Sequence, residues 1–83
     1  MKIRYFAWLR GKVGHAAEDV TPPNEVATVG DLMTWLAADR PGFAEALAKP
    51  GAIRAAVNQD YANPEHPVKP GDEVAFFPPV TGG

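Results

Sequence analysis

The chain has 83 residues, with 8 glycines, 9 prolines, no cysteine and a formal net charge of −2. This length supports one domain with one core, and the share of glycine and proline stays below the roughly 25–30% that marks low-complexity sequence. The absence of cysteine excludes disulfides, thiolate metal sites and thiol nucleophiles. Lys and Arg are scattered singly, so we expect no nucleic-acid or membrane partner. No stretch is apolar for long enough to span a membrane or form a signal peptide, and a cytoplasmic location is expected.

The first predicted element is a strand over residues 2–9. Its apolar side chains alternate, with Ile3 and Tyr5 on one face and Arg4 and Phe6 on the other. Residues 11–27 contain glycines and prolines and predict only a turn, a short strand near residues 18–20 and a loop.

A helix is predicted over residues 29–39. Thr28, followed three residues later by Asp31, resembles a capping box, which satisfies free backbone N–H groups where a helix begins. Apolar residues then recur at helical spacing and form one stripe, which indicates a helix lying on a sheet. The members of the stripe are Val29, Leu32, Met33 and Leu36.

The second half of the chain alternates short elements with turns. Phe43 and Leu47 lie four residues apart, which predicts one or two further helical turns after the break at residues 40–42. Pro70 and Gly71 occupy the two central positions of a predicted type II turn. The predicted strands are residues 52–57, a short return strand from Tyr61, and residues 73–77.

This order of elements predicts an α+β domain: a mixed sheet with one main helix packed on one face. Val74 and Phe76 should face the helix, whereas Phe77 lies on the opposite face, as does Phe6 on the first strand. If the first and last strands are neighbours, Phe6 and Phe77 form an exposed apolar patch of the kind that marks a partner surface.

The polar residues predict no catalytic or metal site. His15 and His66 are far apart in the sequence, without cysteines, so we expect ordinary loop residues and no metal. Serine is also absent, so the usual nucleophile–base pairs cannot form. Trp8 is expected to pack in the core or at its edge, and Asp72, which follows a turn, to be solvated.

The chemistry is expected at the C-terminus, in the sequence FFPPVTGG. Pro78 and Pro79 lack N–H donors, so they end the last strand and start an extended spacer. Six extended residues can reach about 20 Å, and Gly82 and Gly83 can enter a channel too narrow for other residues. The terminal carboxylate becomes an acyl donor once a partner adenylates it. Residues 1–77 are therefore predicted to form the domain and residues 78–83 a flexible tail.

Three segments resemble one known family, the small, sulfur-carrying subunits of molybdopterin synthase in the ubiquitin-like β-grasp superfamily. They are GDEVAFFPPVTGG (residues 71–83), AAVNQ (residues 55–59) and the FA..R pattern of Phe6, Ala7 and Arg10. The resemblance covers nearly the whole chain and is weak from residue 15 to residue 27. The diglycine is shared across the superfamily, but its combination with EVAFFPPV is specific.

The resemblance implies a β-grasp fold and a sulfur-transfer cycle in molybdenum cofactor biosynthesis. An ATP-dependent activating enzyme would adenylate Gly83, which is then converted to a thiocarboxylate. The tail would insert into the large synthase subunit and pass sulfur to a cyclic pyranopterin precursor; its residues are Pro78, Pro79, Val80, Thr81, Gly82 and Gly83. The assembly would hold two small and two large subunits. ATP is used by the partner, so the chain binds no cofactor and is not catalytic alone.

The resemblance also places the contact with the large subunit on Phe6, Tyr61 and Phe77. Three other functions remain open. The chain could be a ubiquitin-like modifier joined through Gly83 to lysines of other proteins. It could instead carry sulfur for thiamine or cysteine synthesis, or be an interaction domain with an inert tail.

Overall fold

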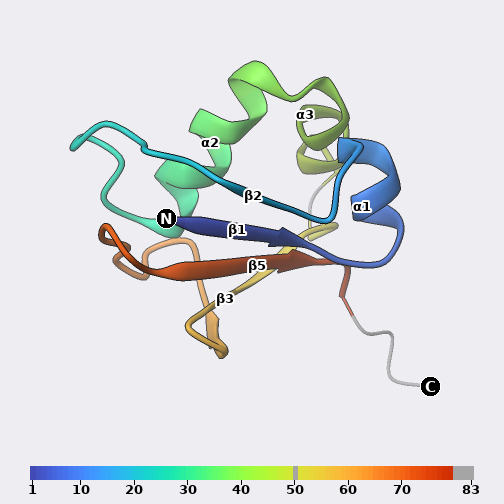
Figure 1. The fold of residues 1–83 in the computed structure, drawn as a ribbon. Coiled ribbons are helices and arrows are strands. Elements are labelled where there is room, and N and C mark those ends of the chain that lie inside the picture. The colour runs from blue at the N-terminus through green and yellow to red at the C-terminus, as the bar shows by residue number, and fades with distance from the viewer. Residues whose placement is uncertain (50, 80–83) are drawn as a thin grey trace.

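The structure, a computed structural model, describes residues 1–49 and 51–79. Within them, a mixed sheet has the strand order β2-β1-β5-β3-β4, with β1 and β5 parallel and the other neighbours antiparallel. The helices lie on one face of the sheet (Figure 1), which confirms the α+β fold. The elements are β1 (Lys2–Tyr5), α1 (Trp8–Val13), β2 (Ala17–Asp19), α2 (Val29–Asp39), α3 (Pro41–Leu47), β3 (Arg54–Val57), β4 (Asp60–Ala62) and β5 (Glu73–Phe77).

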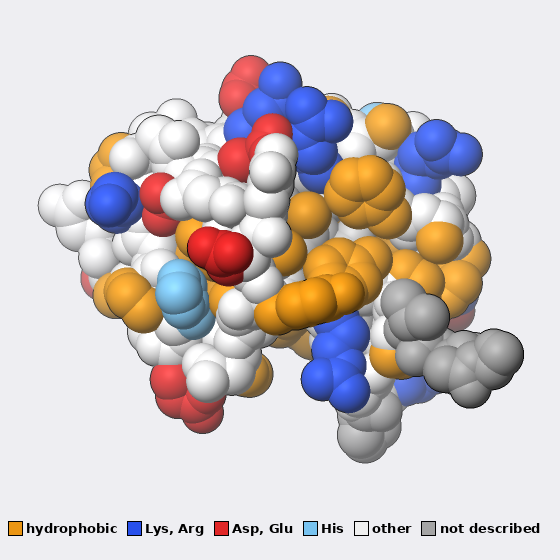
Figure 2. All heavy atoms as spheres, turned by 90° about the horizontal axis from the view of Figure 1, so that it is seen from below, with side chains coloured by type: hydrophobic (Ala, Val, Ile, Leu, Met, Phe, Trp, Pro, Cys, Tyr) orange, Lys and Arg blue, Asp and Glu red, His pale blue; other side chains and the backbone are white. Residues whose placement is uncertain are grey.

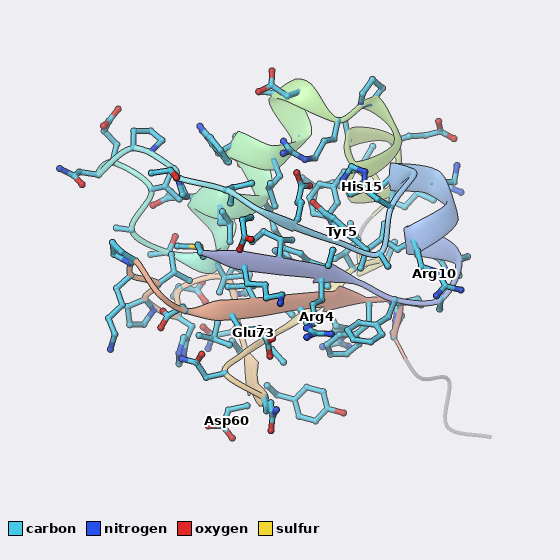
Figure 3. The ribbon with its side chains drawn as sticks, in the orientation of Figure 1. Arg4, Tyr5, Arg10, His15, Asp60 and Glu73 are labelled. Atoms are coloured by element: carbon cyan, nitrogen blue, oxygen red, sulfur yellow. The ribbon has the colours of Figure 1, made fainter. Side chains whose placement is uncertain are left out.

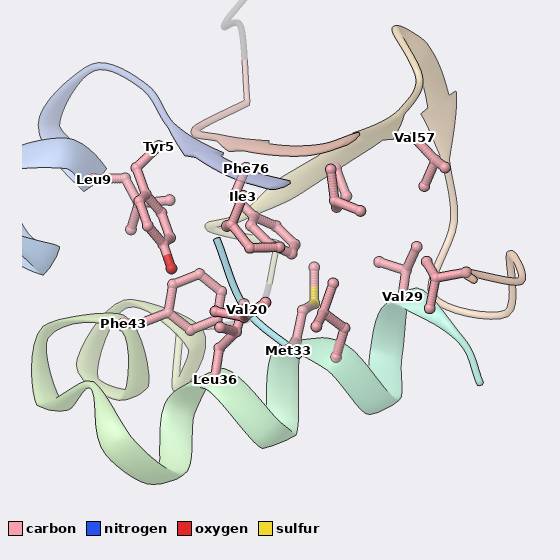
Figure 4. Packing of buried hydrophobic residues seen from close by; sticks show 14 of the residues in the cluster. Ile3, Tyr5, Leu9, Val20, Val29, Met33, Leu36, Phe43, Val57 and Phe76 are labelled. Atoms are coloured by element: carbon pink, nitrogen blue, oxygen red, sulfur yellow. The ribbon is translucent and has the colours of Figure 1, made fainter. Parts of the chain in front are cut away.

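Helix α2 has the bounds that the sequence predicts, and the capping box at its start is confirmed. Thr28 Oγ1 accepts a hydrogen bond from the Asp31 backbone N–H at 3.1 Å, and Asp31 Oδ2 accepts one from the Thr28 N–H at 3.2 Å. All four members of the predicted apolar stripe are buried: Val29, Leu32, Met33 and Leu36. Figure 4 shows Val29, Met33 and Leu36 pointing from α2 towards the sheet.

The centre of the core lies under β1 and β5. Val74 and Phe76 are fully buried on the helix side, as predicted. Phe76 packs edge-to-face on Phe43 of α3, with ring centroids 5.2 Å apart, and Tyr5 stacks beside Phe76 at 6.4 Å. The alternation of β5 therefore decides which side chains enter the core and which lie on the opposite face.

The predicted strand over residues 2–9 is wrong beyond Tyr5. The backbone of Ala7 has a φ of 55°, which turns the chain out of the sheet, and α1 follows. Leu9 is fully buried and Val13, four residues later, packs against the core, so this spacing carried a helical signal. The prediction of one main helix omits α1, and Trp8 is 46% exposed rather than packed in the core.

The prediction that Asp72 is solvated is also wrong, because its side chain is buried. Its carboxylate accepts hydrogen bonds from Asn58 Nδ2 at 3.0 Å and from the Lys69 backbone N–H at 2.9 Å. Gly71 has a φ of 92°, as the predicted type II turn requires. Asp72 thus joins the turn before β5 to the turn after β3.

The remaining boundaries agree with the sequence to within two residues. Strand β3 begins at Arg54 rather than at residue 52, and β5 ends at Phe77. The division between a domain of residues 1–77 and a tail of residues 78–83 stays a prediction, because residues 80–83 lie outside the described part. None of the helices in the described ranges is long and apolar enough to cross a membrane.

Gly42 lies where α3 crosses α1, and the Gly42→Ala variant is expected to lose stability. A Cβ at this position would lie 1.9 Å from the backbone oxygen of Lys12, so the two helices would have to separate. We expect a loss of about 1–3 kcal/mol or more in the free energy of unfolding, measured by denaturant titration. Gly11→Ala is the control, because a Cβ at that site would meet no atom within 4 Å beyond its chain neighbours and the backbone of α1 itself, and the change favours the helix. Equal stability of the two variants would contradict the close approach of Gly42 to the backbone of Lys12.

Glu18 on β2 is the centre of a partly buried polar cluster. Arg40 holds its carboxylate with two hydrogen bonds, from Nε at 2.7 Å and from Nη2 at 2.6 Å, and Tyr5 Oη donates a third at 2.6 Å. His15 Nε2 lies 3.2 Å from the same carboxylate, so this histidine, expected to be an ordinary loop residue, joins the cluster. The hydrogen bond from Arg40 lowers the pKa of Glu18 to about 2, against the opposing effect of burial. Burial and the Glu18 carboxylate raise the pKa of Tyr5.

This cluster predicts a loss of stability in acid. The pKa of Glu18 is lower in the folded chain than its ordinary value of 4.5, so its contribution is present above pH 4.5 and lost as pH falls towards 2. The shift corresponds to about 3 kcal/mol. Denaturant unfolding of the wild type and Glu18→Gln across this range should therefore show the wild type's advantage disappearing. If the difference in the free energy of unfolding between the wild type and Glu18→Gln stayed constant down to pH 2, the prediction would be contradicted.

Candidate functional site

The sheet has a face that none of the described helices covers, called here the open face. Side chains from four strands lie on it: Arg4 of β1, Arg54 and Ala56 of β3, Tyr61 of β4, and Glu73, Ala75 and Phe77 of β5. In Figure 3, Arg4 and Glu73 lie on the side of the sheet away from the helices, whereas Tyr5 and His15 lie between the sheet and the helices. Figure 2 looks onto this face and shows hydrophobic side chains gathered near its centre, with Lys or Arg side chains beside them.

All three residues predicted to contact a partner lie on the open face. Tyr61 is 82% exposed, Phe6 is 45% exposed and Phe77 is half-buried. The Tyr61 and Phe77 rings meet edge-to-face with centroids 5.8 Å apart. We call these two residues the aromatic pair. Exposed aromatic clusters of this kind are typical of protein-binding surfaces, although the contact itself stays a prediction.

Phe6 follows the last residue of β1 and borders a second hollow of the open face. The Phe6 backbone N–H donates to the Phe76 oxygen at 3.1 Å, which continues the pairing of β1 with β5 by one residue. Its side chain borders a hollow of about 370 Å³ whose floor is Ala56 and Ala75, paired across β3 and β5. The open face therefore offers two adjacent apolar contact areas.

The predicted tail begins beside the aromatic pair. Pro78 and Pro79 follow Phe77 directly, and because proline has no N–H the pairing of β5 stops there. Pro79 lines a hollow of about 210 Å³ together with Arg54, Tyr61 and Phe77. The other predicted tail residues, Val80, Thr81, Gly82 and Gly83, lie outside the described residues, so their roles stay predictions.

Sequence reasoning missed two polar residues on the open face. Arg54 is exposed and pairs in register with Phe77, so the alternation of β3 could have placed it beside the aromatic pair. Gln59 has a φ of 73° in the tight turn between β3 and β4 and lines the same hollow as Phe6. Its place depends on a two-residue turn with positive φ, which usually takes Asn and Gly.

The charges on the open face are partly paired. Arg4 Nε donates to Glu73 Oε2 at 2.8 Å across β1 and β5, and because both side chains are about a third or more exposed the pair adds at most about 1 kcal/mol. Among residues 1–49 and 51–79, no three His, Asp or Glu side chains gather in a way that could hold a metal ion.

A mixed sheet with parallel central strands and a capped helix across one face is the ubiquitin-like β-grasp fold. The solved structure of SAMP1, a small archaeal modifier protein of Haloferax volcanii, is similar, with a TM-score of 0.79 and 29% identity over 99% of this chain and 97% of that one. The chain belongs to the ThiS family, whose model matches residues 3–83.

Two curated relatives extend over the full length. The molybdopterin synthase sulfur carrier subunit of Escherichia coli strain K12 is 45% identical, and that of Haemophilus influenzae is 37% identical. Each alignment spans 83 residues, 100% of this chain and 99% of the relative.

Proposed function

We propose that this chain is the sulfur carrier subunit of a molybdopterin synthase. The observation that carries the proposal is its full-length similarity to two proteins of that name, at 45% and 37% identity. The C-terminal sequence GDEVAFFPPVTGG supports it, since this sequence ends in a glycine carboxylate after a proline-stiffened spacer. The lack of cysteine and serine also supports it, because the terminal carboxylate is then the group suited to carry sulfur.

The proposed cycle uses the Gly83 carboxylate as the reactive group. A carboxylate oxygen attacks the α-phosphorus of ATP in an activating enzyme, and pyrophosphate leaves. Sulfide, as HS⁻, then attacks the carbonyl carbon of the adenylate, AMP leaves, and a thiocarboxylate remains on Gly83. In the large subunit the sulfur passes to a cyclic pyranopterin precursor and water restores the carboxylate, and two such donations complete the dithiolene. The chain supplies no catalytic side chain and binds no cofactor itself.

The proposed partner of the open face is the large subunit. Phe6 and the aromatic pair give it an apolar contact area, and Pro78 and Pro79 start the tail from the edge of that area. Docking there would direct residues 78–83 into the partner's active site. Two small and two large subunits would form the complete enzyme, in the cytoplasm.

A reconstituted reaction tests the proposed function. The thiocarboxylated chain, mixed with a large subunit and the pyranopterin precursor, is expected to lose sulfur while the dithiolene product forms. The control is the same chain with an ordinary carboxylate, which should give no product. Binding to the large subunit without sulfur transfer would contradict the proposal.

A second candidate function is protein modification, favoured by the similarity to SAMP1 at 29% identity. In that case the activated Gly83 would be joined to lysine amines of other proteins. Isopeptide-linked adducts in cells, lost when Gly83 is removed, would support it. The 45% identity to a sulfur carrier subunit favours the first function.

A further inference from the structure

Arg54 is an exposed cation in apolar surroundings. It projects from β3 onto the open face, in register with Phe77 on one side. It borders two hollows, of about 210 and 250 Å³, and Tyr61 lines both of them. The other residues that line these two hollows are Ala55, Ala62, Asn63, Phe77 and Pro79, none of which is acidic.

The charged groups of the open face are not distributed evenly. Arg4 is neutralised by Glu73 at 2.8 Å. Arg54, in contrast, forms no ion pair with any residue in the ranges 1–49 and 51–79. The end of the face from which the tail starts therefore carries a positive charge on a chain whose formal net charge is −2.

A partner that covers the aromatic pair must also cover Arg54. Removing water from a guanidinium is costly unless an acceptor of opposite charge replaces that water. A planar guanidinium accommodates a carboxylate with two parallel hydrogen bonds, and Arg and Tyr are enriched among the residues that contribute most to interfaces. A purely apolar partner surface would thus bind poorly at this end of the face.

We propose that Arg54 pairs with an aspartate or glutamate of the large subunit, which lies next to the apolar side chains that cover Tyr61 and Phe77. This carboxylate selects the partner whose surface lies beside the start of the tail. The inference rests on the proposed function, because it names the chemistry of the surface that the large subunit presents. Arg54 on β3 is therefore a specificity-determining residue beside the start of the tail.

The test is the affinity of the complete chain for the large subunit at low and at physiological ionic strength. Relative to the wild type, we expect binding to weaken about 10-fold in Arg54→Gln and about 100-fold or more in Arg54→Glu. The wild-type affinity should fall with added salt, and the fall should be smaller in Arg54→Gln. Melting curves should not change, because Arg54 is exposed.

Lys69→Glu is the matched control. It changes the net charge as Arg54→Glu does, but Lys69 precedes the other end of β5, about 15 Å or more from Phe77 along the strand. The affinity of Lys69→Glu for the large subunit should stay within about twofold of the wild type, because a charge at that distance is screened. Equal losses in Lys69→Glu and Arg54→Glu would show an effect of net charge and overturn the proposal.

The outcomes separate this inference from the proposed function. Failure of the wild-type chain to bind a large subunit or transfer sulfur to the precursor would contradict the proposed function itself. Normal binding and transfer by Arg54→Glu would overturn only the role of Arg54. Normal large-subunit binding with impaired adenylation would also overturn it, by assigning the residue to the activating enzyme.

Discussion

Removal of Gly83 is expected to abolish sulfur transfer and to leave the fold unchanged. The carboxylate of the shortened chain belongs to Gly82, one residue short of the position at which the proposed cycle places adenylation and sulfur transfer. Stability should be unaffected, because β5 ends at Phe77 and Phe76 is the last residue of the buried core in the described ranges.

Two measurements on the Gly83 deletion check this prediction. Sulfur transfer to the precursor should fall to background, and the thermal unfolding curve should keep its midpoint and its cooperativity. A chain with one alanine added after Gly83 is the control for length. It retains both glycines, but its terminal carboxylate belongs to the added alanine. A loss of melting cooperativity in the deletion would mean that the terminus belongs to the folded domain.

A negative charge on the aromatic pair is expected to weaken binding of the large subunit by about 2–4 kcal/mol, or about 30-fold to 1,000-fold in affinity. Phe77→Asp removes an aromatic ring from the contact, and the new carboxylate, in register with Arg54, would compete with the partner's carboxylate for that guanidinium and lose water on binding. Tyr61→Asp tests the same contact with less risk to the fold, since Tyr61 is 82% exposed and contributes little to the core.

Ala38→Asp is the control for the charge itself. Ala38 is exposed on α2, on the side of the sheet opposite the open face, so the same carboxylate there should leave affinity unchanged. Binding would be measured by calorimetry on chains with matched melting curves. Unchanged affinity in both Phe77→Asp and Tyr61→Asp would exclude the open face as the contact area.

Helix and strand bounds were predicted best where local sequence signals agree with the burial of the same residues in the core. Helix α2 has a capping box, an apolar stripe and a proline after its end, and its bounds agree with the prediction. Strand β5 has strict alternation between a turn and two prolines, so both its bounds and its buried face were predictable. The same alternation placed Phe6 and Phe77 on the open face.

The errors arise where distant residues decide the structure. Helix α1 has six residues, contains a glycine and has no side-chain cap, so Leu9 and Val13 signal it only through their contact with the core. Asp72 reads as a solvated turn residue, but it is buried because Asn58, 14 positions earlier, donates to it. Long-range hydrogen bonds of this kind leave no periodic pattern in a sequence.

The candidate site was predictable only in part, because contacts between distant strands also decide its geometry. Tyr61 and Phe77 were assigned to the interface by resemblance, but their direct contact depends on the positions of β4 and β5 beside β3. Arg54 joins them only through the register of β3 with β5. The proposed reactive terminus, in contrast, is a hypothesis from residue types alone, so it did not require a prediction of the fold.

The central claim is that Gly83 carries sulfur, and the intact mass of the chain tests it most directly. The chain would be incubated with ATP, its activating enzyme and a sulfide source, and then weighed by mass spectrometry. The account predicts a gain equal to the replacement of one oxygen by sulfur, located on the C-terminal peptide. An unchanged mass, with covalent adducts of the chain on other proteins, would contradict it.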